Sequence, residues 1–192
     1  NPIINMAGDH GFNMVTFDNV RVPKKNLVGE QNRGWYVGAT LLDFERSGVD
    51  YSAGGRRVLE ELTDYAKNSS QNGSLISNNP IMRNRLANLA IEVEVSRLIS
   101  YNIAWMQGEG LVPNKESSMG KVVGTELQQH LSETGMQMLG LHGQLEPGSK
   151  YAPLDGRIEH MHLTNVSETI QAGTSEIQRN IIATRGLGLP RG

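Results

Sequence analysis

The spacing of apolar residues divides the chain into a short β-type segment and a long helical part. Residues 12–22 alternate between apolar β-formers and polar residues, which predicts a strand that ends at Pro23. From Gly34 onward apolar residues recur every three or four positions, as they do in amphipathic helices. Because two or three strands are marginally stable alone, the first segment is predicted to be the tail of a larger sheet.

The first long helix is predicted over residues 35–68. Gly54 and Gly55 lie inside this range and are expected to kink the helix or to allow close packing. Its expected buried residues are Leu41, Leu42, Val58, Leu62 and Ala66. Residues 69–79 are polar and contain Gly73, so they are expected to form a loop.

The second long helix is predicted to start at Asn79 and Pro80, because Asn caps helices and Pro suits a first turn. Its apolar residues fall into two stripes, one at positions 86, 89, 90 and 93 and one at positions 91, 95, 98, 99, 103 and 106. Two stripes predict burial on more than one face. We therefore expect contacts with another subunit as well as with the core.

The third helix is predicted to begin at an Asn114 cap and to bury one stripe, made of Met119, Val123, Leu127, Leu131 and Met138. Gly120 and Gly124 lie on another face, where a neighbouring backbone can approach closely. Residues 140–156 are expected to be a Gly- and Pro-rich loop. The last helix is predicted near Ser175, where Ser175 and Gln178 fit a capping box, and it stops at Gly186.

These elements predict a mainly α protein, an up-and-down four-helix bundle with a short β remnant at its N-terminus.

The composition limits the classes of partner that this chain is expected to bind. The 192 residues hold 18 Lys and Arg against 20 Asp and Glu, a net charge of −2, which gives no general attraction to nucleic acid. No apolar run reaches the length of about 20 residues that a membrane span needs.

Cysteine is absent, which excludes disulfides and every Cys-based metal site. His160 and His162 lack an evident third ligand, so no metal is expected. The chain opens at Asn1 without an initiator Met, which we interpret as a fragment of a longer polypeptide or a processed chain.

Three strings carry a resemblance to a known family. FDNVRVP at residues 17–23, followed by NLVGE at 26–30, resembles the junction between the middle β domain and the C-terminal helical domain of acyl-CoA dehydrogenases. LDFER at 42–46 matches the early part of that family's first long helix. AGTSEIQRNII at 172–182 with GLGLP at 186–190 is similar to its C-terminal signature.

The resemblance implies that residues 1–31 are the tail of the β domain and residues 32–192 the helical bundle. It implies an FAD-dependent oxidation of an acyl-CoA thioester to the trans-2-enoyl-CoA. It also implies a homo-oligomer, dimer or tetramer, or a related partner subunit, and an electron-transfer flavoprotein or similar acceptor. The expected location is the bacterial cytoplasm, or the mitochondrial matrix in a eukaryote.

The family needs a carboxylate that removes the substrate's α-proton. Many members carry it as a Glu where this chain has Ala172, which cannot take a proton. Isovaleryl-CoA and long-chain acyl-CoA dehydrogenases instead carry the Glu on the first long helix, directly before an Arg, as Glu45 and Arg46 stand here. The resemblance thus implies Glu45 as the base, with substrate contacts from Asp43, Phe44, Arg46, Ala172 and Gly173. The open alternative is a surface Glu45 paired with a cation.

Two further stretches match the family's flavin contacts. One is Gln137, Met138, Leu139, Gly140 and Leu141, which in the family reaches the FAD of a neighbouring subunit, although Leu141 replaces a second Gly. The other is Thr174, Ser175 and Glu176. Without a ligand, the first stretch is explained as a helix end with glycine stop signals, and the second as a capping box.

The chain departs from the family at an Arg-x-x-Phe-Gly motif whose Arg grips the FAD across the dimer. Alignment on Gly73 places Ser69 at the Arg and Asn72 at the Phe, and a later family Gln falls near Pro80. This departure keeps open an alternative, a non-catalytic partner subunit or oligomerisation domain of a heteromeric acyl-CoA dehydrogenase. Because most of the flavin cradle lies in the absent part of the family pattern, this chain alone is expected to hold FAD weakly or not at all.

Overall fold

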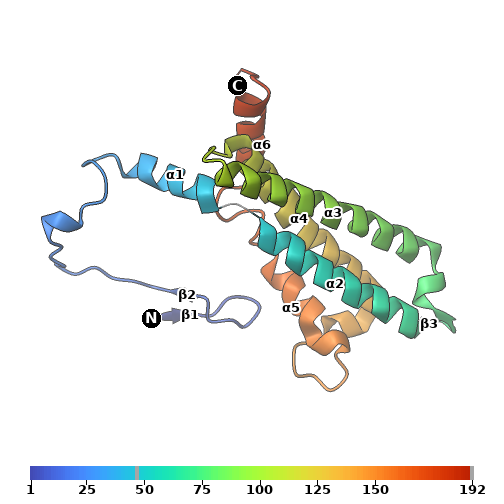
Figure 1. Ribbon diagram of the computed structural model, residues 1–192. Coiled ribbons are helices and arrows are strands. Elements are labelled where there is room, and N and C mark those ends of the chain that lie inside the picture. The colour runs from blue at the N-terminus through green and yellow to red at the C-terminus, as the bar shows by residue number, and fades with distance from the viewer. Residues whose placement is uncertain (46–47, 191–192) are drawn as a thin grey trace.

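Three long helices form the body of the protein. The computed structural model describes residues 1–45 and 48–190, and the side chains of residues 43–45 also lie outside the described part. The helices α2 (Val49–Asn68), α3 (Pro80–Gly108) and α4 (Asn114–Leu139) contact one another and lie side by side (Figure 1). The shorter α5 (Arg157–Thr164) and α6 (Ser175–Ile181) pack on α4. The predicted mainly α bundle is therefore confirmed.

The core lies where α2, α3, α4 and α5 meet. The buried cluster consists of Val58, Leu62, Ala66, Ile76, Leu89, Val93, Leu127, Leu131, Met138, Leu139 and Ile158. Burying a side chain of this size stabilises the fold by roughly 1.5–3 kcal/mol. From the predicted α4 stripe, Leu127, Leu131 and Met138 are buried as expected, Val123 is half-buried and Met119 is exposed.

The predicted first helix is wrong in one respect, because it is two helices. The helix α1 (Gly34–Glu45) ends before residue 46, and α2 starts after Gly48, whose φ of 73° is left-handed. A left-handed residue interrupts the helical hydrogen bonding. Gly54 and Gly55 lie inside α2, and Gly55 allows the expected close packing, since a Cβ there would lie 3.2 Å from Leu127 Cδ2 on α4. Leu41, expected in the core, is 66% exposed on α1, which projects from the end of the bundle (Figure 1).

The predicted strand over residues 12–22 is much shorter. Only β2 (Phe12–Asn13) pairs, antiparallel to β1 (Pro2–Ile3), with Pro2 opposite Asn13 and Ile3 opposite Phe12. Met14 still exchanges backbone hydrogen bonds with Asn1, but residues 15–22 form no described strand and have no described partner strand. The segment extends away from the helices as an arm (Figure 1).

The polar stretch after α2 is a hairpin and not a loop. The strands β3 (Ser70–Gln71) and β4 (Ser74–Leu75) pair around Asn72 and Gly73, which have φ values of 53° and 79°. Two central residues with positive φ are the signature of a type I′ turn, for which Asn-Gly is a strong sequence signal.

Two of the predicted N-cap residues are each one position away from the observed N-cap. Asn114 is the first residue of α4, after Pro113 as N-cap, and is not itself the cap. The last helix begins at Ser175 as predicted, but the cap is Thr174, whose hydroxyl accepts a 3.3 Å hydrogen bond from the Ile177 amide. The short α5 was not predicted, because eight residues hold too little periodicity to mark a helix. The remaining short helical turns are η1 (Lys24–Asn26), η2 (Ile76–Asn78), η3 (Gly140–Gln144), η4 (Pro153–Gly156) and η5 (Ile182–Gly186), the last a π-turn.

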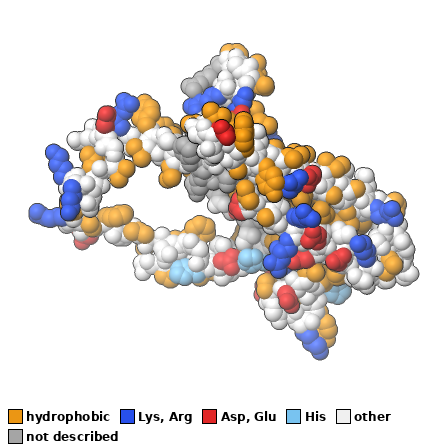
Figure 2. Space-filling view, viewed as in Figure 1, with side chains coloured by type: hydrophobic (Ala, Val, Ile, Leu, Met, Phe, Trp, Pro, Cys, Tyr) orange, Lys and Arg blue, Asp and Glu red, His pale blue; other side chains and the backbone are white. Residues whose placement is uncertain are grey.

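Part of the second apolar stripe of α3 faces outward, since Ile91 is 63% exposed and Val95 and Leu98 are exposed as well. Ile103 of the same stripe is fully buried in the core. Figure 2 shows hydrophobic side chains on this side of α3 and along the N-terminal arm. The predicted subunit contact over this stripe stays a prediction.

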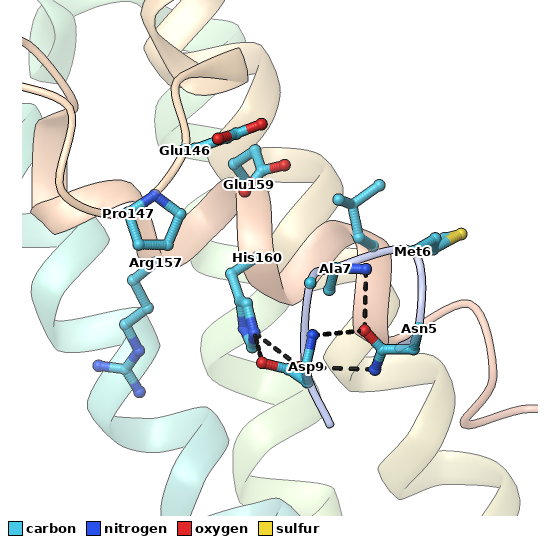
Figure 3. A pocket seen from close by; sticks show the side chains of 11 residues that line it. Asn5, Met6, Ala7, Asp9, Glu146, Pro147, Arg157, Glu159 and His160 are labelled. Carbon is cyan, nitrogen blue, oxygen red and sulfur yellow. Dashed lines mark hydrogen bonds and ion pairs between the residues drawn. The ribbon is translucent and has the colours of Figure 1, made fainter. Parts of the chain in front are cut away.

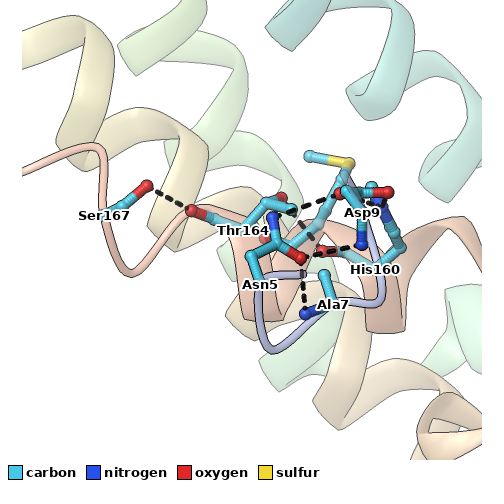
Figure 4. A network of polar contacts seen from close by, with 7 residues as sticks. Asn5, Ala7, Asp9, His160, Thr164 and Ser167 are labelled. Atoms are coloured by element: carbon cyan, nitrogen blue, oxygen red, sulfur yellow. Dashed lines mark hydrogen bonds and ion pairs between the residues drawn. The ribbon is translucent and has the colours of Figure 1, made fainter. Parts of the chain in front are cut away.

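The N-terminal arm returns to the bundle at one turn. In residues 5–9 the Asn5 carboxamide oxygen accepts hydrogen bonds from the Ala7 and Asp9 amides at 3.0 and 2.9 Å (Figure 4). The Asp9 carboxylate meets His160 Nε2 on α5 at 2.9 and 3.0 Å. A cleft of about 710 Å³ lies between this turn, Pro147 and α5 (Figure 3). None of its lining residues is a sequence-predicted site residue.

Acidification is expected to release this turn from α5. The hydrogen bond from His160 holds the pKa of Asp9 below its ordinary value. The pKa of the Asp9 carboxyl is thus lower when the turn is docked on α5 than when it is free. At pH values above the ordinary pKa of about 4, this difference stabilises the docked turn. The stabilisation is lost as the pH falls through the lowered pKa. Amide protection factors at Ala7 and Asp9 are therefore expected to fall below pH about 4. In Asp9→Asn they should be low at every pH, and constant protection in the wild type down to acid would contradict the prediction.

Candidate active site

The predicted site residues fall at opposite ends of the bundle. Residues 43–45 close α1, and residues 172–176 lead into α6, at the end where α1, α2 and α6 meet (Figure 1). Residues 137–141 lie at the other end, where α4 passes into η3. At 1.5 Å per residue, Gly124 and Gly140 are roughly 25 Å apart along α4.

The end of α1 carries the predicted base and three predicted substrate contacts. Glu45 is the last residue of α1, and Asp43 and Phe44 precede it, but their side chains lie outside the described part. Arg46 lies outside the described residues altogether. The chain resumes at Gly48, which is buried beside Ser100 of α3 and the Gly120 carbonyl of α4. Gly48, three residues after the end of α1, therefore packs between α3 and α4.

An irregular segment, residues 165–173, runs beside this junction and is bound to α4 by side chains. Buried Lys121 donates a 2.8 Å hydrogen bond to the Glu168 carbonyl. Gln129 donates to the Asn165 carbonyl at 3.0 Å and to the Thr169 hydroxyl at 3.2 Å. Residues 121 and 129 share one helix face, since eight residues make slightly more than two turns. The segment therefore has a defined position although it has no regular secondary structure.

The same segment is tied to α2. Tyr51, in the first turn of α2, donates its hydroxyl to Glu168 Oε2 at 3.3 Å. Its ring lies on Gly124, where a Cβ would come within 2.6 Å of Cδ2, so only glycine fits there without a shift. The close neighbour at Gly124 is therefore the Tyr51 side chain and not the backbone that the sequence predicted.

The segment ends in two residues with unusual backbone conformation. Ala172 has a φ of 52° and Gly173 a φ of 95°. A left-handed alanine costs about 1 kcal/mol or more and persists where its surroundings hold it. The carbonyls of both residues accept from the side chain of buried Gln178, at 3.4 Å each, so α6 holds the strained pair in place.

The start of α6 is occupied by its own residues. The Thr174 hydroxyl caps the helix, and Ser175 is buried. The pKa of Glu176 is lowered by its own backbone N–H and by the Thr174 hydroxyl, so its carboxylate is ionised at neutral pH. A negative charge here opposes a phosphate group and suits a ribose or adenine contact.

The residues at the other end divide into core and surface. Met138 and Leu139 are 2% and 6% exposed and belong to the core cluster, so any contact they make with a ligand is through their backbone. Gln137 is exposed and Leu141 is 82% exposed. Gly140 takes a φ of 57°, and a Cβ there would lie 3.8 Å from the Gln71 side chain of the hairpin.

This neighbourhood joins two stretches that the resemblance associates with the flavin. Ser69 and Asn72, which stand at the family's Arg and Phe, belong to the region of the hairpin that approaches Gly140. Asn72 is suited to its positive φ, where an aromatic residue would be strained. Gln137 and Leu141 beside Gly140 are exposed.

Sequence reasoning missed Tyr51, Lys121 and Glu168. Their contacts join residues far apart in sequence, and no local pattern marks such a contact. Within the described residues, no cluster of three or more His, Asp or Glu side chains is placed to hold a metal ion. Over the same described ranges, no helix is long and apolar enough to cross a membrane.

Comparison with known proteins identifies the family of this chain. The family model for the acyl-CoA dehydrogenase C-terminal domain matches residues 32–187. Acyl-CoA dehydrogenase FadE26 of Mycobacterium tuberculosis is 35% identical over 196 residues, covering 99% of this chain and 48% of the relative. The chain thus spans about half the length of the relatives it matches.

Solved structures agree with this match. The ChsE4-ChsE5 complex from Mycobacterium tuberculosis is similar with a TM-score of 0.85 and 33% identity, covering 100% of this chain and 50% of that chain. The Tcur3481-Tcur3483 steroid ACAD is similar with a TM-score of 0.83 and 30% identity, covering 100% of this chain and 49% of that chain. By sequence and by fold, this chain belongs to the acyl-CoA dehydrogenase family.

Proposed function

We propose that this chain is the C-terminal half of an FAD-dependent acyl-CoA dehydrogenase that uses Glu45 as its α-proton base. The observation that carries the proposal is the placement of two chain segments. The end of α1 and the Ala172–Gly173 pair lie at one end of the bundle, and the Tyr51–Glu168 hydrogen bond connects their neighbourhoods at 3.3 Å. Since Ala172 cannot take a proton, the base must come from another element, and α1 supplies a carboxylate there.

In this proposal Glu45 removes the proton from the α-carbon of the thioester. Asp43, Phe44 and Arg46 contact the substrate beside Glu45, and Ala172 and Gly173 contact it from the segment before α6. FAD, when bound, supplies the acceptor for the hydride that leaves the β-carbon.

The flavin contacts are proposed to come from both ends of the bundle. Thr174, Ser175 and Glu176 contact the FAD at the substrate end, with Glu176 toward ribose or adenine. Gln137, Gly140 and Leu141 contact the FAD of a second subunit, with Met138 and Leu139 contributing backbone atoms. Because the two groups lie at opposite ends of the bundle, we propose that a second chain brings both kinds of contact to one flavin.

The proposed assembly is a homo-oligomer, dimer or tetramer, or a complex with a related subunit. The outward stripe of α3 suits such an interface, because exposed apolar stripes of this kind mark association surfaces. We propose that residues 1–31 are the tail of a middle β domain, that an electron-transfer flavoprotein reoxidises the flavin, and that the protein acts in the cytoplasm, as its bacterial relatives suggest.

The substrate class is proposed to be a bulky acyl-CoA. Two supports converge: a base on the first long helix, and 30% identity to a structure described as a steroid ACAD. Ala172 adds a physical reason, since its methyl group is smaller than the Glu side chain that many relatives carry at this position.

A substrate panel tests the proposal. The full-length protein should be purified, its mass and flavin content measured, and acyl-CoAs with straight, branched and steroid side chains added without oxygen. We expect an oligomer with bound FAD, bleached fastest by a bulky acyl-CoA. Bleaching by straight chains alone would contradict the substrate class, and absence of bleaching with every member would contradict the activity.

A second candidate function is a non-catalytic subunit of a heteromeric enzyme. Ser69 favours it, because it does not replace the charge of the family's Arg, and Asn72 stands where the family has a Phe. Similarity to the ChsE4-ChsE5 complex is also consistent with a two-subunit assembly. The same panel distinguishes it: a protein that lacks FAD alone, and that bleaches only after a second subunit is added, is this candidate.

A further inference from the structure

We propose that the Tyr51–Glu168 hydrogen bond is a positioning contact, which sets where Ala172 and Gly173 stand relative to the end of α1. This inference rests on the proposed function, because it assigns the contact a role in that reaction. Tyr51 and Glu168 are positioning residues and not catalytic ones, since they act through the segments they join.

Tyr51 is itself held rigidly. Its ring lies against Gly124 of α4, and its backbone carbonyl accepts a 3.0 Å hydrogen bond from the Gln128 side chain. With ring and backbone both fixed on α4, the hydroxyl has a defined direction. It meets Glu168 Oε2 at 3.3 Å across 117 positions of sequence.

Glu168 is held from a second side. Lys121, 3% exposed, donates to its backbone carbonyl at 2.8 Å. The next residue, Thr169, accepts from Gln129 through its hydroxyl and from the Ser175 amide through its carbonyl, at 3.2 and 2.9 Å. The chain between these anchors contains Ala172 and Gly173. Moving Glu168 therefore moves the pair that is proposed to contact the substrate.

The hydrogen bond from Tyr51 differs from those of Lys121 and Gln129 in the helix that it connects to the segment. Lys121 and Gln129 join the segment to α4, whereas Tyr51 joins it to α2, three residues after Gly48 and so next to the end of α1. Loss of the hydroxyl leaves the α4 anchors in place and frees the segment to shift relative to α1. A misplacement near 1 Å between reacting groups costs about 100-fold in rate.

The test compares variants of the full-length holoenzyme. Tyr51→Phe removes the hydroxyl and leaves the ring on Gly124, Glu168→Ala removes the acceptor, and Glu168→Gln keeps an acceptor oxygen. Tyr65→Phe, a half-buried hydroxyl loss near the other end of α2, is the matched control. The measurements are the anaerobic rate of flavin bleaching at saturating acyl-CoA, the half-saturating concentration, the FAD content, and amide exchange over residues 168–173.

Tyr51→Phe and Glu168→Ala are expected to lower the bleaching rate about 10- to 100-fold, with amide exchange over 168–173 raised. The half-saturating concentration should change less than about threefold, since an interaction that acts in the transition state lowers the rate more than the binding. FAD content should be unchanged. Glu168→Gln should recover most of the rate, and the double variant Tyr51→Phe/Glu168→Ala should be no slower than either single variant.

Two results overturn the inference. One is a bleaching rate in Tyr51→Phe within about twofold of the wild type and of Tyr65→Phe. The other is a lost rate with FAD content lost in proportion, which indicates a purely structural role. If none of the acyl-CoAs bleaches the flavin of the wild type, the proposed function fails, and the positioning role fails with it. Amide exchange then still reports whether Tyr51 holds the segment, and unchanged exchange refutes that contact too.

Discussion

Glu45→Gln in the full-length protein is expected to bind FAD as the wild type does and to lose flavin bleaching by acyl-CoA by about 10²- to 10⁴-fold, the contribution of a general base. Gln keeps the shape of the side chain and removes its basicity. The large expected effect follows from Ala172, because the position that carries the base in many relatives holds no titratable group here. The measurement is the anaerobic decay of flavin absorbance after mixing.

The matched control is Glu60→Gln on α2. Glu60 is exposed and pairs with Arg56 at 3.0 Å, a surface pair of the kind that contributes at most about 1 kcal/mol. Its variant should bleach at the wild-type rate. Equal rates for Glu45→Gln and the wild type would remove Glu45 from the mechanism and direct the search to a carboxylate elsewhere in the full-length protein.

The second large expected effect is on the free energy of unfolding, and it concerns Gly156, which directly precedes α5. Gly156→Ala is expected to destabilise the protein by about 3 kcal/mol, as the sum of a left-handed alanine and overpacking. Gly156 has a φ of 73°, and its Cβ would lie 2.5 Å from the Pro147 nitrogen and 2.7 Å from the Glu146 carbonyl carbon. These neighbours are backbone atoms, so no rotamer change relieves the clash. Thermal unfolding of the full-length variant measures the loss.

Gly148→Ala separates the two causes. Gly148 has a φ of 84°, but a Cβ there would stand in open space, with no heavy atom within 4 Å. The substitution should cost only the conformational part, about 1 kcal/mol. If both variants melt alike, the contact with Pro147 carries none of the effect, and the close packing of α5 against this loop would be refuted as the cause.

Local sequence was sufficient for the long helices and for the family. The α3 start is a local event: Asn79 accepts a 2.9 Å hydrogen bond from the Ile81 amide, and Pro80 occupies the first turn. The buried positions Leu127, Leu131 and Met138 follow from a period close to four residues. The C-terminal signature from Ala172 onward is likewise a run of neighbours, readable without any fold.

Breaks in regular structure were harder to predict, because they depend on single backbone conformations. The apolar period runs on either side of Gly48, so only its left-handed φ reveals that α1 and α2 are separate. The hairpin at Asn72 and Gly73 is different. Its Asn-Gly signal was present in the sequence, and the flanking pairs are too short and polar to have an alternating pattern.

The sequence by itself determined the helical class, the absence of cysteine chemistry and the candidate residues Glu45 and Ala172. Tertiary structure alone decided which segments meet. The Tyr51–Glu168 and Lys121–Glu168 contacts span 117 and 47 positions, and the buried cluster joins four helices. Periodicity indicates which face of a helix is apolar, but it does not indicate which neighbouring helix that face packs against. Pairing is decided by the packing of all helices together, since each buried polar group must find its partner within the same close-packed interior.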